Sequence, residues 1–319
     1  MSTYRQSLPQ LTGDLFLTDG GIETTLIFHE GFDLPLFASF VLLRDPAGRE
    51  GLKRYFKGYA DIATDKGTGF IFDSPTWRAN PDWGWRLGHS ARDLADINRD
   101  AIELMVELRA QYAGAKMPMV VSGNIGPRGD AYDPAILMDP VEAEYYHAEQ
   151  IKVFAETEAD MVTAMTMTNT NEAIGVARAA RSAGIPAVIS FTVETDGRLP
   201  SGECLGQAIE AVDEATGASP AYYMINCAHP EHFEDTLAKS GAWVERLKGL
   251  RANASTMSHA ELDEAEELDE GDPEALGAHH ANLVGRHPTL NVFGGCCGTD
   301  PRHISSICVH HQHGVRNAA

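Results

Sequence analysis

Short apolar runs bounded by turn residues alternate along this chain with longer segments of helical period. The runs cover residues 15–19, 70–73, 119–123, 161–165, 187–191, 221–226, 247–252 and 290–294. Amphipathic segments between them, among them 51–66, 91–112, 140–158, 171–183 and 274–285, predict helices. Because a parallel strand needs a crossover helix to return to the same end, this alternation predicts a closed or doubly wound parallel sheet, and eight repeats favour a (β/α)8 barrel.

Polar residues and glycines follow several of these predicted strands at their carboxyl ends. They are Asp19-Gly20-Gly21, Asp73, Asn124, Asn226-Cys227, Asn253 and Gly294-Gly295-Cys296-Cys297. Barrel enzymes build their sites at this end of the strands. We therefore expect one site at one mouth, in a single domain spanning residues 1–319, with an acidic insertion around 258–273.

Composition and charge narrow the class of protein. No stretch approaches the roughly 20 apolar residues that a membrane span needs, and the first 14 residues lack the basic cluster and apolar run of a secretion signal, so we expect a cytoplasmic protein. The net charge of -21 opposes binding to nucleic acid. Residues 261–272 (ELDEAEELDEGD) predict a solvated helix or loop, because the ligand spacing of an EF-hand calcium loop is missing.

The five cysteines are an odd number in a chain without a secretion signal, which indicates reduced thiols. Cys204 and Cys308 are expected to be small buried hydrophobes. Cys296 and Cys297 are adjacent and framed by glycines, and Cys227 ends a different predicted strand. These three sulfurs can meet at the barrel mouth as a zinc site with an open fourth position. A strained vicinal disulfide and two unrelated core thiols are the alternatives for the adjacent pair.

Three segments resemble the signature of the homocysteine S-methyltransferase family. They are Asp19-Gly20-Gly21, Ile225-Asn226-Cys227 and Gly294-Gly295-Cys296-Cys297-Gly298-Thr299, and the resemblance runs over residues 15–307, including the turn at 123–127 and residues 190–192. It implies a (β/α)8 barrel that binds zinc through Cys227, Cys296 and Cys297 and methylates homocysteine to methionine.

The implied chemistry needs no protein nucleophile. A free thiol with a pKa near about 8.5 is a poor nucleophile at neutral pH, and zinc holds it as a thiolate. The catalytic group is then the zinc-bound substrate thiolate. A donor methyl placed in line, roughly 3 to 3.5 Å away, transfers by direct displacement.

The resemblance also implies a binding site for the acceptor. Asp19 is expected to meet the ammonium group of homocysteine, backbone amides near Gly20 and Gly21 its carboxylate, and Asn226 to orient the site. The plain alternative for Asp-Gly-Gly is a simple turn.

One departure from the family concerns the end of the fourth predicted strand. Met165 stands where the family usually places a glutamate that also meets the substrate ammonium. Either Glu23 or Glu172 compensates for this loss, or the acceptor is a different thiol.

The methyl donor is expected to be small and cationic, of the S-methylmethionine or betaine type, because the chain has no room for folate or cobalamin domains. Three of the four tryptophans, Trp77, Trp83 and Trp85, fall in the loop after the second predicted strand. Aromatic faces bind onium cations, so we expect a cage with Trp77 as its best candidate and Asp73 beside it. The alternative is a loop that packs its own aromatics.

Other interpretations stay open at this point. His229 or His303 is a possible fourth metal ligand, which would close the open position, and residues 310–313 are expected to be a solvated tail. A metal-dependent hydrolase on the same barrel is disfavoured, because such sites collect His and Asp ligands. A non-catalytic zinc- or thiol-binding barrel is the remaining alternative. The expected partners are a small thiol acceptor and a methyl donor, without nucleic acid or membrane, and no oligomeric state is predicted.

Overall fold

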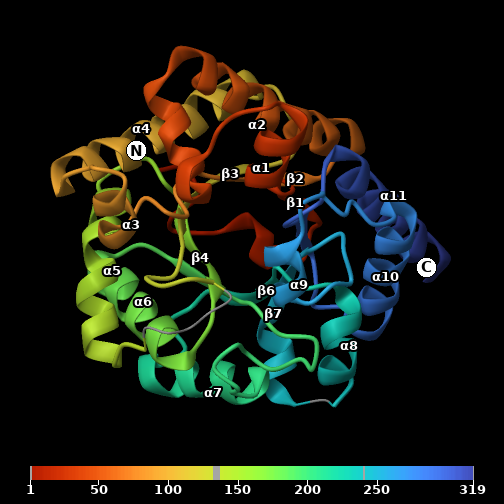
Figure 1. Ribbon diagram of the computed structural model, residues 1–319. Coiled ribbons are helices and arrows are strands. Elements are labelled where there is room, and N and C mark those ends of the chain that lie inside the picture. The colour runs from red at the N-terminus through yellow and green to blue at the C-terminus, as the bar shows by residue number, and fades with distance from the viewer. Residues whose placement is uncertain (1, 132–136, 240, 319) are drawn as a thin grey trace.

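The computed structural model, which describes residues 2–131, 137–239 and 241–318, contains a closed barrel of eight parallel strands in sequential order (Figure 1). The strands are β1 (Phe16–Leu17), β2 (Gly69–Asp73), β3 (Met119–Ile125), β4 (Met161–Met167), β5 (Ala187–Phe191), β6 (Tyr222–Asn226), β7 (Leu247–Ala252) and β8 (Val292–Gly295). β1 pairs with both β2 and β8, which closes the sheet. The predicted (β/α)8 barrel is confirmed.

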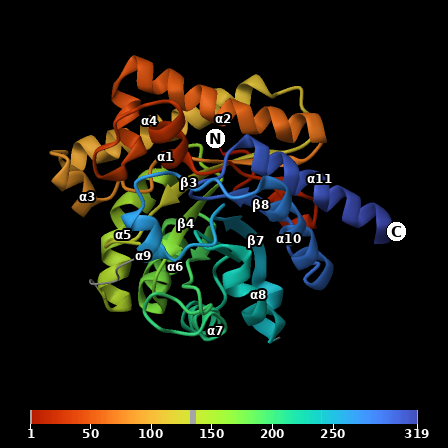
Figure 2. The ribbon, with the colours of Figure 1, turned by 45° about the vertical axis from the view of Figure 1, so that its right-hand side comes forward.

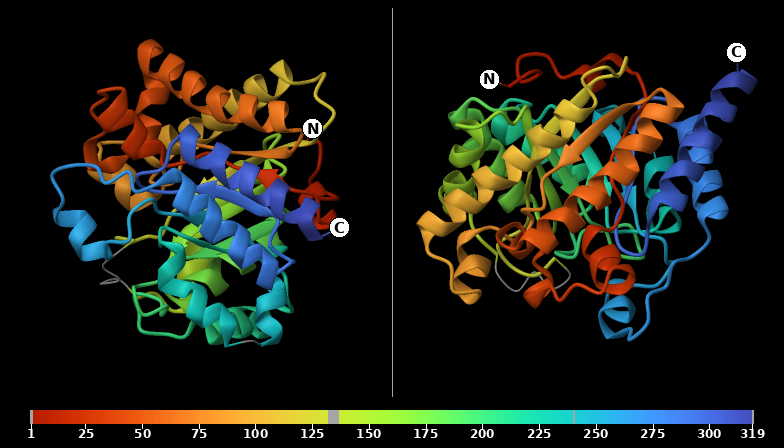
Figure 3. Two further views of the ribbon diagram at one scale, coloured as in Figure 1. Left: turned by 90° about the vertical axis from the view of Figure 1, so that its right-hand side faces the viewer. Right: turned by 90° about the horizontal axis from the view of Figure 1, so that it is seen from above.

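Helices follow the strands along the chain, and most of them form an outer ring around the barrel, which is seen from the side in Figure 3. They are α1 (Ile22–Thr24), α2 (Pro46–Lys66), α3 (Pro81–Arg86), α4 (Ala91–Gln111), α5 (Pro140–Ala155), α6 (Thr170–Ala183), α7 (Leu205–Thr216), α8 (Pro230–Ala238), α9 (His259–Glu264), α10 (Pro273–Arg286) and α11 (Pro301–Ala318). Short helical turns add Pro9–Thr12, Thr25–His29, Pro35–Phe37, Ser39–Arg44 and Ala242–Arg246. None of the helices in the described ranges has the length and apolarity that a membrane crossing requires.

The strands read as apolar runs because they are buried on both faces. Their outer faces pack on the helices in the larger of two apolar clusters. Their inner faces fill the barrel below the mouth with the smaller cluster: Leu8, Phe16, Ile71, Val120, Met161, Val188, Tyr222, Met224 and Val292. Leu8 comes from the N-terminal segment, which lies at the barrel end opposite α9 in Figure 3. The core therefore occupies one end of the barrel and leaves the other for a site.

Most element boundaries follow the sequence pattern, and the exceptions have local causes. Helix α2 begins at Pro46 instead of residue 51, because the Asp45 side chain accepts a hydrogen bond from the Gly48 amide at 2.7 Å and proline suits the first helical position. Strand β1 is shorter than the predicted 15–19, and β8 starts at Val292 instead of residue 290. The Asn291 side chain donates hydrogen bonds to the carbonyls of Gln10 and Asp14, which attaches the N-terminal segment to the start of β8.

Candidate metal centre and pocket

A cavity of about 370 Å³ opens at the carboxyl ends of the strands. Its wall includes residues from the ends of β1, β2, β4, β6, β7 and β8. Most of the residues expected at the mouth line it, namely Asp19, Gly20, Gly21, Asp73, Trp77, Asn124, Asn226, Cys227, Cys296 and Cys297, whereas Asn253, Gly294 and Gly295 are outside its wall. The closed barrel thus brings these segments together at one mouth.

Three cysteine sulfurs gather in the wall of this cavity. The Cys227 Sγ lies 2.9 Å from the Cys296 Sγ and 3.7 Å from the Cys297 Sγ, and all three lie within 4.8 Å of one another. Two sulfurs bound to one tetrahedral zinc at about 2.3 Å would be roughly 3.8 Å apart. The three thiols therefore fit a single ion with small adjustments, and the shorter distance is a thiol hydrogen bond.

None of the five cysteines forms a disulfide, which excludes the vicinal disulfide of Cys296 and Cys297. Cys308 is buried as expected, but the same expectation for Cys204 is wrong. Cys204 is half-buried at the start of α7, where its sulfur accepts a hydrogen bond from Arg198 at 3.1 Å. A loop position beside solvent, instead of a strand or inner helix face, explains the difference.

The pKa values of the Cys227 and Cys296 thiols shift in opposite directions. Hydrogen bonds from Cys227 and Cys297 lower the pKa of the Cys296 thiol, and the nearby positive charge of Arg251 acts in the same direction. The pKa of Cys227 is raised by its hydrogen bonds to the other two sulfurs and by burial. Of these two thiols, Cys296 is therefore the one that loses its proton more readily to become a thiolate ligand.

The backbone of Cys227 adopts a left-handed conformation, with φ of 58°, which is unusual for a residue other than glycine. Neighbouring groups hold it there. Its carbonyl accepts hydrogen bonds from His259 Nε2 at 2.7 Å and Asn253 Nδ2 at 3.1 Å, and its amide donates to the Arg251 carbonyl at 3.0 Å. Strand β7 and the first residue of α9 thus aim the Cys227 side chain at the other sulfurs.

Glycine at position 295 lets the Cys296-Cys297 turn close on itself. A Cβ atom there would lie 1.9 Å from Thr299 Oγ1. On the other side of the turn, the Gly21 amide donates to the Thr299 carbonyl at 3.0 Å and to its hydroxyl at 3.1 Å. The Gly21 amide, one of those expected to bind a substrate carboxylate, therefore has partners within the chain.

A buried ion cluster lies at the base of the cavity. Arg251, from β7, bonds to Asp19 at 2.8 Å and to Asp73 at 2.9 Å, while the Tyr55 hydroxyl donates to Asp19 at 2.9 Å. Burial raises the pKa of Asp19 to about 6, against the opposing effect of Arg251. Two carboxylates and one guanidinium leave a formal charge of −1. Sequence reasoning missed Arg251, although a charged residue inside an apolar strand run was a signal for it.

The Asn226 side chain links neighbouring strands through hydrogen bonds beside the cysteines. Its side-chain oxygen accepts from the Thr166 amide at 2.9 Å and the Ser190 hydroxyl at 2.6 Å, and its amide group donates to the Thr166 hydroxyl at 3.0 Å. Strands β4, β5 and β6 are tied together by one side chain immediately before Cys227.

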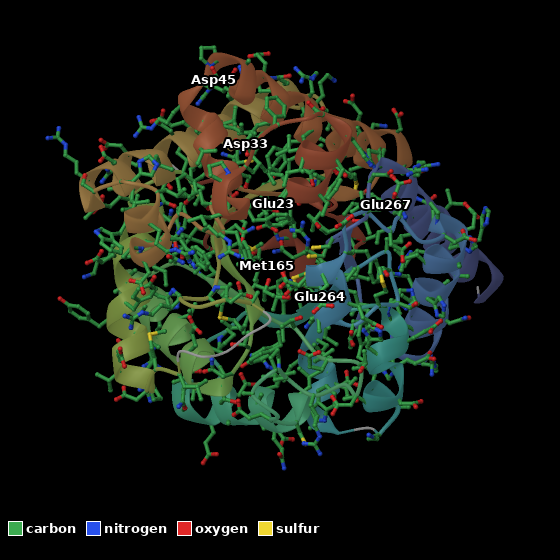
Figure 4. The ribbon with its side chains drawn as sticks, in the orientation of Figure 1. Glu23, Asp33, Asp45, Met165, Glu264 and Glu267 are labelled. Atoms are coloured by element: carbon green, nitrogen blue, oxygen red, sulfur yellow. The ribbon has the colours of Figure 1, made fainter. Side chains whose placement is uncertain are left out.

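Glu23 and Glu172, the two acids that could compensate for Met165, lie in different places. Met165 and Glu23 both line the cavity, and Figure 4 shows them near the centre of the mouth. Glu172 is 2% exposed and bonded to His147 at 2.9 Å, outside the cavity wall. Burial raises the pKa of Glu23 to about 7 despite a hydrogen bond from Ser39 at 2.8 Å. Glu23 is thus the acid that can face a ligand.

The tryptophan loop packs differently from the three-sided cage that its sequence suggested. Trp77 lines the cavity and donates from its indole nitrogen to the Met165 carbonyl at 3.4 Å. Trp83 is buried outside the cavity wall and Trp85 is 78% exposed. The Arg78 guanidinium lies over the rings of both Trp77, at 4.6 Å, and Trp83, at 3.5 Å.

The acidic segment is more than a solvated face, because one side of it lies over the mouth. Figure 2 shows α9 projecting there, and Figure 4 places Glu264 and Glu267 beside the opening. The segment contributes Leu262, Asp263, Ala265, Glu267, Leu268 and Asp269 to the cavity wall. It is anchored by the hydrogen bonds of His259 to Cys227 and of Ser255 to Asp269, the latter at 2.6 Å.

No histidine joins the sulfurs in the described part of the chain. His229 caps the N-terminus of α8, and His303 is bonded to Asp300 and to the Glu270 carbonyl. Both are therefore engaged in structural contacts, which leaves the position facing the cavity open.

Comparison with known proteins places this geometry in context. A family model described as homocysteine S-methyltransferase matches residues 16–310. Homocysteine S-methyltransferase 1 of Brassica oleracea var. italica is 21% identical over 96% of this chain and 96% of its own length. Selenocysteine Se-methyltransferase of the same plant is 24% identical over 93% of this chain and 88% of its own length.

Two solved structures share the fold. The metallated form of the homocysteine methyltransferase MmuM from Escherichia coli has a TM-score of 0.68 and 17% identity, covering 93% of this chain and 96% of that one. The oxidized form of the same protein has a TM-score of 0.72 and 16% identity, covering 96% and 99%.

Proposed function

This chain belongs to the homocysteine S-methyltransferase family, and we propose that it transfers a methyl group from a small sulfonium or quaternary ammonium donor to homocysteine, giving methionine. The observation that carries the proposal is the group of three cysteine sulfurs, none of them in a disulfide, in the wall of a cavity large enough for small substrates. A methyltransferase for a different thiol and a non-catalytic zinc-binding barrel are the alternatives that the experiment below separates.

We infer that Cys227, Cys296 and Cys297 bind zinc. A set of three sulfurs is soft, suits zinc, and lacks the His and Asp ligands of hydrolytic sites. When bound, the metal would supply the charge that keeps an acceptor thiol deprotonated at neutral pH. The chain itself aims the ligands, through the carbonyl contacts of Cys227 and the glycines around the Cys296-Cys297 turn.

We propose that Glu23 receives the ammonium group of the acceptor. It lines the cavity beside Met165, the position where the resemblance predicts an acid. Asp19, whose oxygens already meet Arg251 and Tyr55, contributes through the net negative charge of its cluster. Gly20 and Gly21 shape the wall, and Asn226 keeps Cys227 in position.

A cationic donor of the S-methylmethionine or betaine type is supported by the acidic rim of the cavity. Glu23, Asp263, Glu267 and Asp269 all line it. Acids outnumber the two arginines of the wall, Arg78 and Arg251, and an excess of negative charge in a cleft concentrates cationic ligands. We place the onium group near Trp77 and Asp73, on the side of the cavity formed by β2.

We further propose that the chain acts as one domain on small molecules alone, in the reducing cytoplasm. Cysteines outside any disulfide are compatible with that compartment, and the acidic charge opposes polyanionic partners.

The test combines metal content with turnover. The purified protein should carry one zinc per chain by plasma mass spectrometry, and it should form methionine from homocysteine with S-methylmethionine or betaine. Cys296→Ser and Cys297→Ser should lose the metal and at least about 100-fold in activity, because a catalytic zinc needs its three protein ligands. Cys204→Ser, which alters a free cysteine outside the cavity, is the matched control and should retain both.

Two outcomes would contradict the proposal. Full zinc loading and normal turnover in Cys296→Ser would show that Cys296 is not a ligand of a catalytic zinc. Stoichiometric zinc in the wild type without methylation of homocysteine by any donor would favour the non-catalytic barrel, or another thiol if one is methylated instead.

A further inference from the structure

Arg78 stands out in the cavity wall because its guanidinium is stacked between two indoles. It lies 3.5 Å from the ring centre of Trp83 and 4.6 Å from that of Trp77. Trp83 is itself backed by a second arginine, Arg86, at 4.3 Å. Stacking of this kind fixes the plane of the guanidinium while leaving its edge, which carries the N–H donors, free to face a ligand.

The position of Trp77 is itself determined by close packing. A Cβ atom on Gly126 would lie 2.3 Å from the Trp77 carbonyl oxygen and 2.8 Å from the indole Cδ1. The indole nitrogen donates to the Met165 carbonyl. The contacts with Gly126, which follows β3, and with Met165, in β4, thus fix the position of the Trp77 ring over which Arg78 lies.

The hydrogen-bonding capacity of Arg78 is poorly used. Its side chain is only 10% exposed, and its Nε is buried without a hydrogen-bond partner. The ion pair to Asp130 spans 3.8 Å, longer than a hydrogen bond, and the Asp130 side chain is 48% exposed. Burial lowers the pKa of Arg78, which reflects this loss of solvation. Within the described residues, the buried guanidinium therefore has one exposed acid as its ion-pair partner and an Nε without an acceptor, and a second anion would compensate for its loss of solvation.

The anion that fits is a planar carboxylate. A guanidinium fork binds a carboxylate through two parallel hydrogen bonds, and a fork held in plane by two indoles is prepared for that geometry. Glu23, the other charged group facing Arg78 from the cavity wall, lies beyond the distance of a direct ion pair in the described structure. An α-amino acid can therefore place its ammonium toward Glu23 and its carboxylate toward Arg78.

We propose that Arg78 binds the carboxylate of an amino-acid substrate in this cavity and so selects substrates that carry one. The proposal rests on the proposed methyl transfer, because it uses the same cavity. Both homocysteine and the expected donors carry a carboxylate, so the chemistry is shared and the experiment separates the two sources.

The experiment compares Arg78→Gln and Arg78→Lys with wild type, using substrates that differ only in the carboxylate. On the acceptor side these are homocysteine and 3-aminopropane-1-thiol. On the donor side they are S-methylmethionine and (3-aminopropyl)dimethylsulfonium. Arg78→Gln should lower kcat/KM about 30-fold for one carboxylate-bearing partner, the loss expected for a charge-assisted contact. It should leave the carboxylate-free counterpart within about twofold, and Arg78→Lys should lie between.

The matched control is Arg86→Gln. Arg86 is an arginine of the same loop stacked on the same indole, but it is exposed and outside the cavity wall. Arg86→Gln should leave kcat/KM unchanged for all four substrates. Equal losses for substrates with and without the carboxylate, or no loss for either, would overturn the role of Arg78.

A binding measurement makes the outcome independent of turnover. Quenching of tryptophan fluorescence should report S-methylmethionine and homocysteine binding to wild type, because Trp77 and Trp83 contact Arg78. Weaker binding of the carboxylate-bearing compound to Arg78→Gln supports the proposal even if no methyl is transferred. Unchanged affinity refutes it even if the enzyme is active.

Discussion

Replacing Arg251 with methionine should destabilise the protein more than any change at its surface. Methionine keeps much of the volume but removes the charge that sits 2.8 Å from Asp19 and 2.9 Å from Asp73. It also leaves the carbonyls of Gly20 and Gly295 without their donors. Removing one partner of a buried ion pair costs about 3–5 kcal/mol.

The loss is measurable as a fall in melting temperature. At roughly 2 °C per kcal/mol for a chain of this size, the change corresponds to a decrease of about 6–10 °C. The assay is thermal unfolding followed by circular dichroism at pH 7.5, under reducing conditions and with metal removed. Arg246→Met is the control, because Arg246 pairs with Asp213 at 2.8 Å but both side chains are 20–30% exposed, at 30% and 21%. It should cost about 1 kcal/mol or less.

The pH dependence gives a second readout. The folded pKa of Asp19, about 6, lies above its ordinary value of 3.8, so the folded state binds more protons between these values. Asp19 therefore contributes stability at pH 4 that is lost as the pH rises to about 6. Without Arg251, whose charge lowers the pKa of Asp19, this window should extend above pH 6.

The deficit of Arg251→Met should consequently be larger at pH 7.5 than at pH 5.5, and adding Asp19→Asn should recover part of it. A melting temperature within 2 °C of Arg246→Met at pH 7.5, or a deficit that grows on acidification, would refute the reasoning.

Two further predictions concern the cavity and the cysteine turn. Because the pKa of Glu23 is about 7, its charge appears as the pH rises from 6 to 8. The KM for homocysteine should fall over that range. Glu23→Gln should raise this KM about tenfold at pH 8, and it should abolish the part of the KM difference between homocysteine and 4-mercaptobutyrate, which lacks only the ammonium, that depends on Glu23. A KM ratio between these two acceptors that is the same in Glu23→Gln and wild type would contradict this role. Gly295→Ala should reduce zinc affinity at least about tenfold by competition with a chelator, because its Cβ would lie 1.9 Å from Thr299 Oγ1. The control is Gly285→Ala in α10, where an added Cβ would meet nothing within 4 Å. It should leave zinc binding unchanged and raise the free energy of unfolding by about 0.5–1 kcal/mol. Equal zinc affinity in both variants would show that the cysteine turn tolerates a side chain at position 295.

The strand order was predictable from the sequence because each strand is buried on both faces and therefore reads as an apolar run. The ends of those runs also located the cavity residues, since parallel strands all finish at the same end of a barrel. The boundaries of β1 and α2 were less predictable. They depend on a cap by Asp45 and on contacts of the N-terminal segment with Asn291, which no local period encodes.

The electrostatics of the cavity were not predictable in the same way. Arg251 lies in an apolar run, and its two aspartate partners are 178 and 232 positions away in the sequence, which only barrel closure brings together. The acidic residues 261–272 carry no pattern that says which side they face. No local pattern in the tryptophan loop indicated that Arg78 would lie over two of its indoles.

The sequence by itself determined the alternation of strands and helices, the adjacent cysteines with their glycines, and the third cysteine at a strand end. These features are local, because each depends on residue type and on the spacing of near neighbours. Only the tertiary structure decided which charges neutralise one another, which acid faces the cavity and which arginine has a buried N–H without an acceptor in the described structure. Those properties depend on distances between segments far apart in the chain, and burial makes the resulting interactions strong enough to matter.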